Sequence, residues 1–373
     1  MEYIDCPLSH KQQEKLFDAL DDDLKSYFPQ YLRRDLRRWK RQLKLKNSSF
    51  NNFKKEEKMK LNVLDAGEFL EKAVQELKGM SGKVVAPKIK KTKGGLKEVA
   101  VLLFSDFHYG RINKILNPET GEVETTYNKQ IAVNELNRLL DGIFTIDNLL
   151  RGSYQIDKLH VFGLGDLVEG DLIFEGQKFF IEGGVGQQVI EGATHLANFL
   201  KVLLGEFKEI EFINVIGNHG RFTKRRSAAP PANNFDYFVG KILETMFANE
   251  PRIKFVCPES RFFIKDIFGW KYYLHHGEEI TGWMGLPYYG IVRQAKARKA
   301  ETNYNIDCMG HWHTRMEIPV GSTAYTLVNG SFVPKDENAF VRLGVLSKPE
   351  QYYFGVSPRR PRSWSFSLDL KRS

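Results

Sequence analysis

Five short motifs rich in histidine and carboxylate residues occur along this chain, each at or just after an apolar run of β-strand character. In chain order they read Ser105-Asp106-Phe107-His108, Gly165-Asp166-Leu167-Val168-Glu169, Gly217-Asn218-His219, His275-His276-Gly277 and Gly310-His311-Trp312-His313. In an α/β sheet, the residues just past a strand lie on loops over a rigid scaffold, where ligands and substrates collect. The motifs therefore predict one shared site at the end of a set of strands.

The part of the chain that carries the motifs alternates short β-branched and aromatic runs with longer helical patterns. This alternation indicates an α/β domain in which sheet layers are flanked by helices. The predicted strands are 99–104, 158–164, 211–216, 253–256, 270–274, 305–309 and 325–328. The predicted helices are 128–150, 186–207, 234–247 and 288–299.

The residues before this domain differ in charge and pattern. Residues 1–98 hold 23 Lys and Arg against 15 Asp and Glu, so they account for eight of the nine net positive charges. Residues 1–82 have helical apolar spacing and are predicted to form a basic helical appendage, and the lysine-rich stretch 83–96 is predicted to be a linker. The appendage could hold a polyanion near the domain 97–373, bind a protein partner, or carry its charges only on a solvated helix face.

Cysteine usage and hydropathy bear on the compartment. Cys6, Cys257 and Cys308 are odd in number and widely spaced, so they support neither a disulfide framework nor a thiolate zinc site. The first fifteen residues contain no apolar stretch, and no later run is long enough to span a bilayer. These patterns predict a cytoplasmic protein without membrane association, and they leave its oligomeric state open.

The residue types in the five motifs suit a site for two divalent metal ions. A carboxylate can bridge two cations, while imidazole and amide groups complete each set of ligands. This mixture of oxygen and nitrogen donors suits Mn²⁺, Fe or Zn²⁺ better than Ca²⁺, with Mn²⁺ the preferred candidate and Mg²⁺ also open. A single histidine is more often structural than a ligand. Six of the nine histidines lie in these motifs, however, and such clustering predicts a common site.

The order DxH, GDxxE, GNH, HG and GHxH, followed by Val328-Asn329-Gly330-Ser331, resembles the calcineurin-like metallophosphoesterase superfamily over about residues 99–331. The layout is most similar to Mre11/SbcD-type nucleases and phage-type phosphoesterases. The resemblance implies a four-layered αββα sandwich in the domain 97–373. It also implies one metal held by Asp106, His108, Asp166 and His313, and a second held by Asp166, Asn218, His276 and His311. His276 is assigned in preference to His275 because the family's ligand directly precedes glycine.

The resemblance also implies roles for two residues that are not metal ligands. His219 would stabilise the transition state or protonate the leaving oxygen. In family members with Asp at the last position of the second motif, that carboxylate orients the histidine of the GNH motif, so Glu169 is expected to orient His219. Gly220 departs from the family pattern, which usually has Asp or Glu at that position.

The implied activity is metal-assisted hydrolysis of a phosphate ester, by in-line attack of a hydroxide that bridges the two metals. Arg221, Arg225 and Arg226 follow the third motif and are candidate substrate-binding residues. Together with the basic N-terminal region they favour a nuclease acting on DNA or RNA. Two alternatives are a phosphomonoesterase acting on nucleotides, nucleic-acid ends or phosphoproteins, and an inactive nucleic-acid-binding adaptor.

Overall fold

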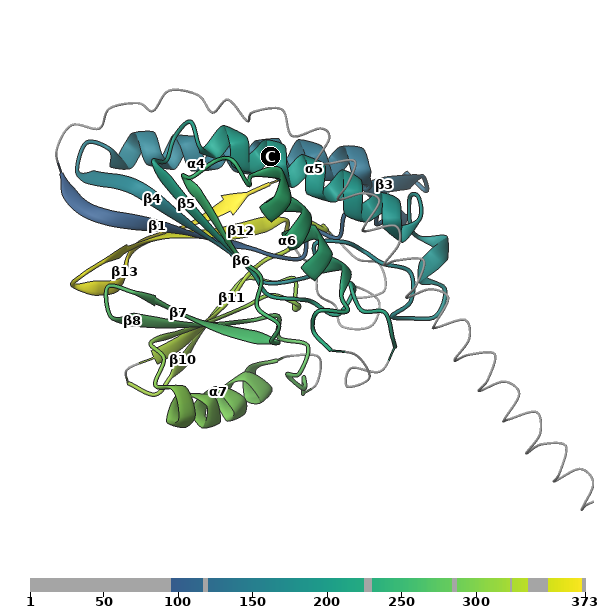
Figure 1. Cartoon of the computed structure of the whole chain (residues 1–373). Coiled ribbons are helices and arrows are strands. Elements are labelled where there is room, and N and C mark those ends of the chain that lie inside the picture. Colours follow the sequence, from purple (N-terminus) through teal and green to yellow (C-terminus); the bar gives the residue numbers. More distant parts are fainter. Residues whose placement is uncertain are drawn as a thin grey trace, which may run out of the picture. The chain divides into compact units, whose positions relative to one another are not determined.

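The computed structural model describes residues 95–116, 120–224, 230–283, 287–322, 324–334 and 348–370. The predicted appendage 1–82 and almost all of the predicted linker 83–96 lie outside these residues, so their boundaries stay predictions. The described residues form four layers in the order helices, sheet, sheet and helix (Figure 1). This is the predicted αββα sandwich. None of the described helices combines the length and apolarity needed to cross a membrane.

The first sheet has six strands in the order β13-β12-β1-β4-β5-β6. Four of them pair in parallel: β1 (Leu96–Phe104), β4 (Tyr154–Gly163), β5 (Glu209–Asn214) and β6 (Ile253–Val256). The other two, β12 (Glu350–Ser357) and β13 (Arg360–Asp369), extend the sheet in antiparallel fashion beside β1.

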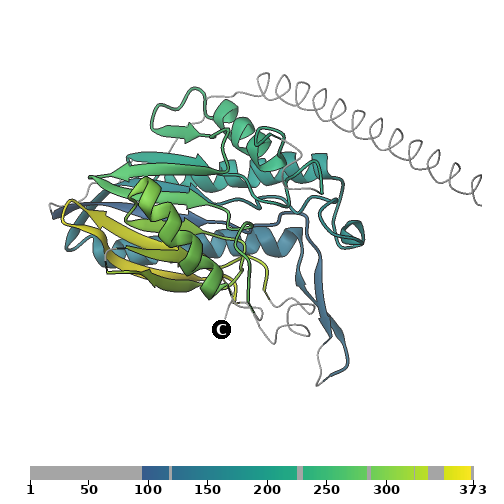
Figure 2. The same cartoon turned by 90° about the horizontal axis from the view of Figure 1, so that it is seen from below.

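The second sheet has five strands in the order β10-β11-β9-β8-β7. They are β7 (Phe262–Ile267), β8 (Trp270–His275), β9 (Ile306–Met309), β10 (Met316–Val320) and β11 (Ala324–Val328). Strands β8, β9 and β11 run parallel, while β7 and β10 pair antiparallel at the two edges. A separate hairpin of β2 (Asn113–Leu116) and β3 (Val123–Tyr127) extends from the body of the domain (Figure 2).

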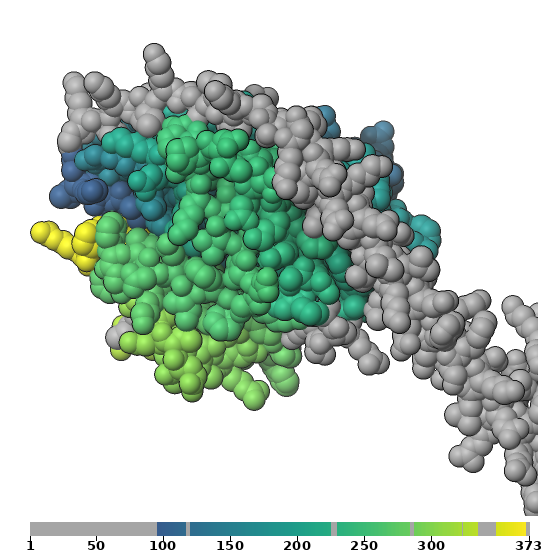
Figure 3. Space-filling view, in the orientation of Figure 1, coloured from purple at the N-terminus to yellow at the C-terminus, as the bar shows by residue number. Residues whose placement is uncertain are grey.

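Three helices cover the outer face of the six-stranded sheet: α4 (Lys129–Leu150), α5 (Val185–Leu203) and α6 (Phe235–Met246) (Figure 1). Asparagine caps two of them, because the Asn128 side chain accepts a hydrogen bond from Ile131 N at α4 and the Asn234 side chain accepts one from Asp236 N at α6. Helix α7 (Tyr288–Thr302) covers the outer face of the five-stranded sheet and forms the lower part of the face seen in Figure 3.

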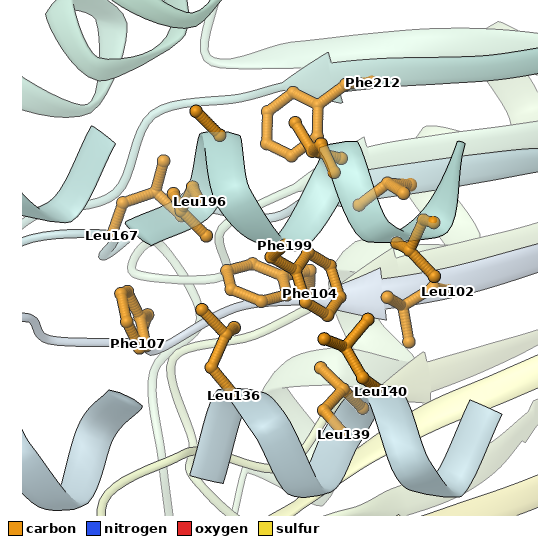
Figure 4. Packing of buried hydrophobic residues seen from close by; sticks show 14 of the residues in the cluster. Leu102, Phe104, Phe107, Leu136, Leu139, Leu140, Leu167, Leu196, Phe199 and Phe212 are labelled. Atoms are coloured by element: carbon orange, nitrogen blue, oxygen red, sulfur yellow. The ribbon is translucent and has the colours of Figure 1, made fainter. Parts of the chain in front are cut away.

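The sequence of β1 explains its central position between two apolar layers. Leu102 and Phe104 pack beneath the helices with Leu136 and Phe199 (Figure 4), whereas Leu103 and its alternate neighbours face the second sheet. Successive side chains of a strand point to opposite faces, so a strand buried on both faces must be apolar throughout. The uninterrupted run from Val99 to Phe104 meets this requirement.

All the predicted strands and helices that fall on the described residues are present, but β2, β3, β7, β10, β12 and β13 were not predicted. Strands β7 and β10 form the edges of their sheet, and edge strands carry mixed polar and apolar residues. Strand β13 alternates polar residues with Trp364, Phe366 and Leu368. That period of two is typical of a half-buried strand, so its signal was present in the sequence.

Candidate metal centre

The five motifs lie where the parallel strands of both sheets end. The first three follow β1, β4 and β5 of the six-stranded sheet. In the five-stranded sheet, the fourth begins at the last residue of β8 and the fifth follows β9. Backbone hydrogen bonds join neighbouring motifs, with 3.1 Å between Asp106 N and Gly165 O and 3.0 Å between Gly310 N and His276 O. A hydrogen bond of 2.8 Å between His276 Nδ1 and Leu164 O joins the two sets, so the loops of both sheets meet at one place.

One group of donor atoms consists of Asp106, His108 and His313, whose candidate ligand atoms all lie within 4.8 Å of one another. The Nε2 atoms of His108 and His313 are 3.1 Å apart, and His313 Nε2 lies 3.3 Å from Asp106 Oδ1. Asp166 Oδ2 approaches His108 Nε2 at 3.9 Å. These four residues are the ligands expected for the first metal.

A second group consists of Asp166, His276 and His311. Nε2 of His276 lies 3.0 Å from Asp166 Oδ2, 2.9 Å from Asn218 Oδ1 and 3.2 Å from His311 Nδ1. The structure thus brings together all seven side chains expected to bind metal. Asp166 reaches both groups, as a bridging carboxylate must.

The two adjacent histidines of the fourth motif point in different directions. His276 Nδ1 hydrogen-bonds to Leu164 O at 2.8 Å, which turns its Nε2 toward the other donors. His275 Nε2 instead contacts Asp307 Oδ1 at 2.8 Å, and Arg298 of α7 lies beside it. Strand alternation separates the two rings, and His276 is the one that reaches the donor cluster.

The backbone at the donor residues adopts conformations that L-amino acids rarely occupy. Asp106, His108, Asp166, His311 and His313 have φ angles of 53°, 43°, 54°, 72° and 54°. Only two other non-glycine residues in the described part of the chain have a positive φ. Such strain persists only where the surrounding structure enforces it, and it gathers at functional sites.

Gly165 shows how closely two of the loops approach each other. Its φ is 90°, and a Cβ atom there would lie 2.5 Å from Gly217 N, so any larger residue would push the second and third motifs apart.

The hydrogen bonds around the imidazoles leave ring nitrogens that fit a cation. His108 Nδ1 lies 2.8 Å from Glu169 Oε2, and His276 Nδ1 donates to the Leu164 carbonyl. With Nδ1 serving as donor, Nε2 of each ring is left to act as a ligand. Two nitrogen atoms that face each other at 3.1–3.2 Å, as in the His108–His313 and His276–His311 pairs, require a proton or a cation between them. The donor set therefore fits a divalent metal centre.

The pKa values lead to the same conclusion. Burial acts to lower the pKa of His108, but hydrogen bonds to Asp106 and Glu169 raise it to about 9. Burial likewise opposes the charged form of His276, whereas Asp166 raises its pKa to about 10. Burial and the neighbouring His276 lower the pKa of His311 to about 3. Protons on His108 and His276 thus balance the buried carboxylates when metal is absent, and bound cations would replace them.

His219 and Glu169 lie directly beside the donor groups. His219 N donates to Asp166 Oδ1 at 2.8 Å, and its Nδ1 lies 3.0 Å from the Glu169 carbonyl oxygen. The Glu169 carboxylate is 3.2 Å from His219 Nδ1 and 2.8 Å from His108 Nδ1, so it contacts both rings. Burial acts to raise the pKa of Glu169, but His219, Arg111 and His108 hold it well below its usual range.

A buried carboxylate that the sequence analysis did not single out supports two of the ligand loops. Asp236, in the first turn of α6, accepts hydrogen bonds from Asp166 N and Gly217 N at 2.8 Å and from Leu167 N at 2.9 Å. Burial and the charge of Asp166 raise its pKa to about 6. Its sequence signal is only that of an acidic residue in a helix's first turn, which does not distinguish it from many others.

Two further residues, Gly220 and Gln177, lie close to the loops of the candidate site. A Cβ at Gly220 would lie 2.3 Å from Asn234 Oδ1, which accepts a hydrogen bond from Asp236 N, so a larger residue at this position would have to displace that cap. Gln177, also missed, is buried and donates from Nε2 to the carbonyl oxygen of Glu169 at 2.7 Å.

The candidate substrate-binding arginines fall into two cases. Arg221 donates from Nε to the Asn218 carbonyl oxygen at 3.1 Å and pairs with Glu278 at the same distance. It is therefore placed to support the Asn218 loop. Arg225 and Arg226 lie outside the described residues, so their predicted role stays a prediction.

No family model matches the sequence, and a search of curated proteins finds no match. Among solved structures, zinc-bound Vps29 from Entamoeba histolytica is 14% identical and matches 73% of this chain and 99% of its own, with a TM-score of 0.29. A metallophosphoesterase from Sphaerobacter thermophilus is 16% identical, with coverages of 74% and 89% and a TM-score of 0.31. A dimetal phosphatase from Danio rerio is 8% identical, with coverages of 73% and 99% and a TM-score of 0.31.

At such low identities and TM-scores, this likeness carries no argument about the family or the activity of this chain. The structure itself supplies two observations: the αββα layers and the convergence of the donor side chains. The described residues thus form an αββα fold in which the candidate donor side chains converge at one end of both sheets.

Proposed function

We propose that this chain is a dinuclear metal-dependent phosphodiesterase that hydrolyses DNA or RNA. The observation that carries the proposal is the convergence of seven Asp, Asn and His side chains from five loops, with Asp166 common to both donor groups. Five of the seven are held in positive-φ conformations, which indicates that the fold enforces the arrangement.

The residues proposed to hold the metals divide as the donor groups do. Asp106, His108, Asp166 and His313 would hold one ion, and Asp166, Asn218, His276 and His311 the other. Mn²⁺ is the ion we favour for this mixture of oxygen and nitrogen donors. When bound, the two ions would activate water for attack and neutralise charge on the phosphoryl oxygens.

The protein supplies the proton for the leaving group. His219 Nδ1 is held by the Glu169 carbonyl oxygen at 3.0 Å, so Nε2 is the ring atom left to donate to a leaving oxygen. The hydrogen bond from His219 N to Asp166 Oδ1 fixes this residue relative to the proposed metals. Glu169 would keep the ring in this orientation through its second contact at 3.2 Å.

Charge supports a nucleic-acid substrate. The chain carries a net charge of +9. In addition, α7 exposes Tyr289, Arg293 and Lys296 at a spacing that places them on one face of the helix. Basic side chains beside an aromatic ring suit a nucleic-acid strand, because phosphate contacts dominate affinity. The setting we propose is cytoplasmic.

The test is cleavage of end-labelled single- and double-stranded DNA and RNA in the presence of Mn²⁺. We expect metal-dependent cleavage by the natural chain, none by Asp166→Asn, and full activity in Asp141→Asn, which changes an exposed carboxylate on α4. Parallel rates on a bis-aryl and a mono-aryl phosphate identify the ester class. Preference for the monoester would replace the proposal with a phosphomonoesterase, and binding of nucleic acid without any cleavage would replace it with an adaptor.

A further inference from the structure

Three phenylalanines are exposed on the loop that follows the second motif. The exposed fractions of Phe174, Phe179 and Phe180 are 43%, 75% and 54%. Exposed apolar side chains that gather beside polar residues commonly mark a surface that binds something. Of the three, Phe174 is the one whose ring contacts a histidine of the site described above.

Phe174 touches His219. Their ring centroids are 5.9 Å apart in an edge-on arrangement, and a second ring, that of His108, lies 4.5 Å from the His219 ring. His219 therefore has a donor residue of the metal centre on one side and a partly exposed aromatic ring on another. Phe174 is therefore an exposed aromatic ring in contact with the residue that we propose protonates the leaving oxygen.

The loop that carries Phe174 is held in place by its own hydrogen bonds. Buried Gln177 accepts from Ile173 N at 2.7 Å through Oε1 and donates to Glu169 through Nε2. Farther along, the Phe180 carbonyl oxygen accepts from Ile112 N at 2.8 Å. The ring of Phe174 is thus presented by a braced loop, and a preorganised ring loses less entropy when a ligand packs on it.

We propose that Phe174 is a specificity-determining residue that stacks on a nucleobase, namely the base of the nucleotide on the leaving side of the scissile phosphate. This inference rests on the phosphodiesterase function proposed above. A nucleobase is the occupant whose flat, partly polar ring matches an aromatic face, and it is present on a nucleic-acid substrate at the required place. Phe179 serves as a comparison, because it lies on the same loop and its recorded ring contact is with Lys178 at 5.6 Å.

The experiment measures kcat/KM on three dinucleotides with Mn²⁺: one with both bases, one lacking the leaving-side base and one lacking the opposite base. The full chain is compared with Phe174→Ala, Phe174→Trp and Phe179→Ala. Base stacking on an aromatic ring typically changes affinity by about tenfold or more. We expect Phe174→Ala to lose about that factor on substrates with the leaving-side base, and to leave the rate on the substrate without it unchanged. Phe174→Trp should retain the preference, and Phe179→Ala should match the natural chain.

Other outcomes separate this inference from the proposed function. If the natural chain cleaves all three dinucleotides equally, or if Phe174→Ala lowers all three rates by one factor, then Phe174 does not read a base and the inference is wrong while the phosphodiesterase proposal stands. An equal loss in Phe179→Ala would assign the effect to the general apolarity of the loop and would also overturn it. Failure of the natural chain to cleave any phosphodiester would overturn the proposed function itself.

Discussion

Replacing His219 with alanine tests the division of labour between metal binding and proton transfer. The ring is held at Nδ1 by the Glu169 carbonyl at 3.0 Å and lies near Gln177 Nε2 at 3.2 Å, so its orientation is well fixed. A positioned general acid contributes about 10²- to 10⁴-fold to the rate. That range corresponds to about 3 to 5 kcal/mol of activation free energy, and for an alkyl leaving oxygen we expect a loss within it.

The same substitution should matter far less when the leaving group needs no proton. On a nitrophenyl diester, whose leaving oxygen is already a stable anion near neutral pH, we expect the loss to shrink to about tenfold or less. The amount of Mn²⁺ retained after loading and desalting, measured by elemental analysis, should be unchanged. His195→Ala, which removes a partly buried histidine of α5 outside the motifs, should leave both rates as they are.

If His219 is a metal ligand rather than a proton donor, the same substitution should reduce metal content. His219 lies in a group with His108 and Asp166 whose candidate ligand atoms are all within 4.8 Å of one another, so it could itself be a ligand. In that case His219→Ala would lose about one metal ion per chain and would slow both substrates equally. This result would refute the assignment of His219 as the proton donor.

Three further predictions concern the surroundings of the centre and the pH dependence of the protein. Asp236→Asn should weaken Mn²⁺ binding about 10- to 100-fold in calorimetric titrations, because residues that position metal ligands typically have effects of this size. Glu244→Gln on the same helix should have no effect. Metal loading at pH 7.5 should release about two protons, and the affinity for metal should increase as the pH rises. The reason is that the metal-free pKa values of His108 and His276 are raised to about 9 and about 10. Metal binding without proton release would contradict this. Burial raises the pKa of Asp147 to about 7, so the folded protein binds this proton more tightly than the unfolded chain does. The resulting contribution to the free energy of unfolding is fully present below about pH 4 and is lost as the pH rises through about 7. This group should cost the metal-free protein about 2 to 3 kcal/mol between pH 5 and pH 8 in urea unfolding, and Asp147→Asn should abolish that part of the slope.

Much of the site could be predicted from the sequence because the chemistry of a metal centre restricts residue types strongly. Asp, Asn and His are not interchangeable with other residues as ligands, so they stand out at the ends of apolar runs such as 99–104. The choice of His276 over His275 rested on the resemblance, in which the ligand directly precedes glycine. In the structure it is His276 that reaches the other donors. The central strands were predictable for a related reason, since burial on both faces leaves only apolar residues possible.

The supporting residues could not be predicted in this way, because their roles depend on contacts between distant parts of the chain. Asp236 becomes a support for Asp166 only when the start of α6 packs against the loop after β4. Phe174 is an ordinary loop phenylalanine until the fold places its ring against His219. The sequence by itself determined which side chains could bind metal and which runs had to be buried. Tertiary structure alone decided which candidate donors lie close together, which carboxylates brace their loops and which aromatic ring contacts His219. Hydrogen bonds and ring contacts depend on positions in space that sequence spacing does not specify.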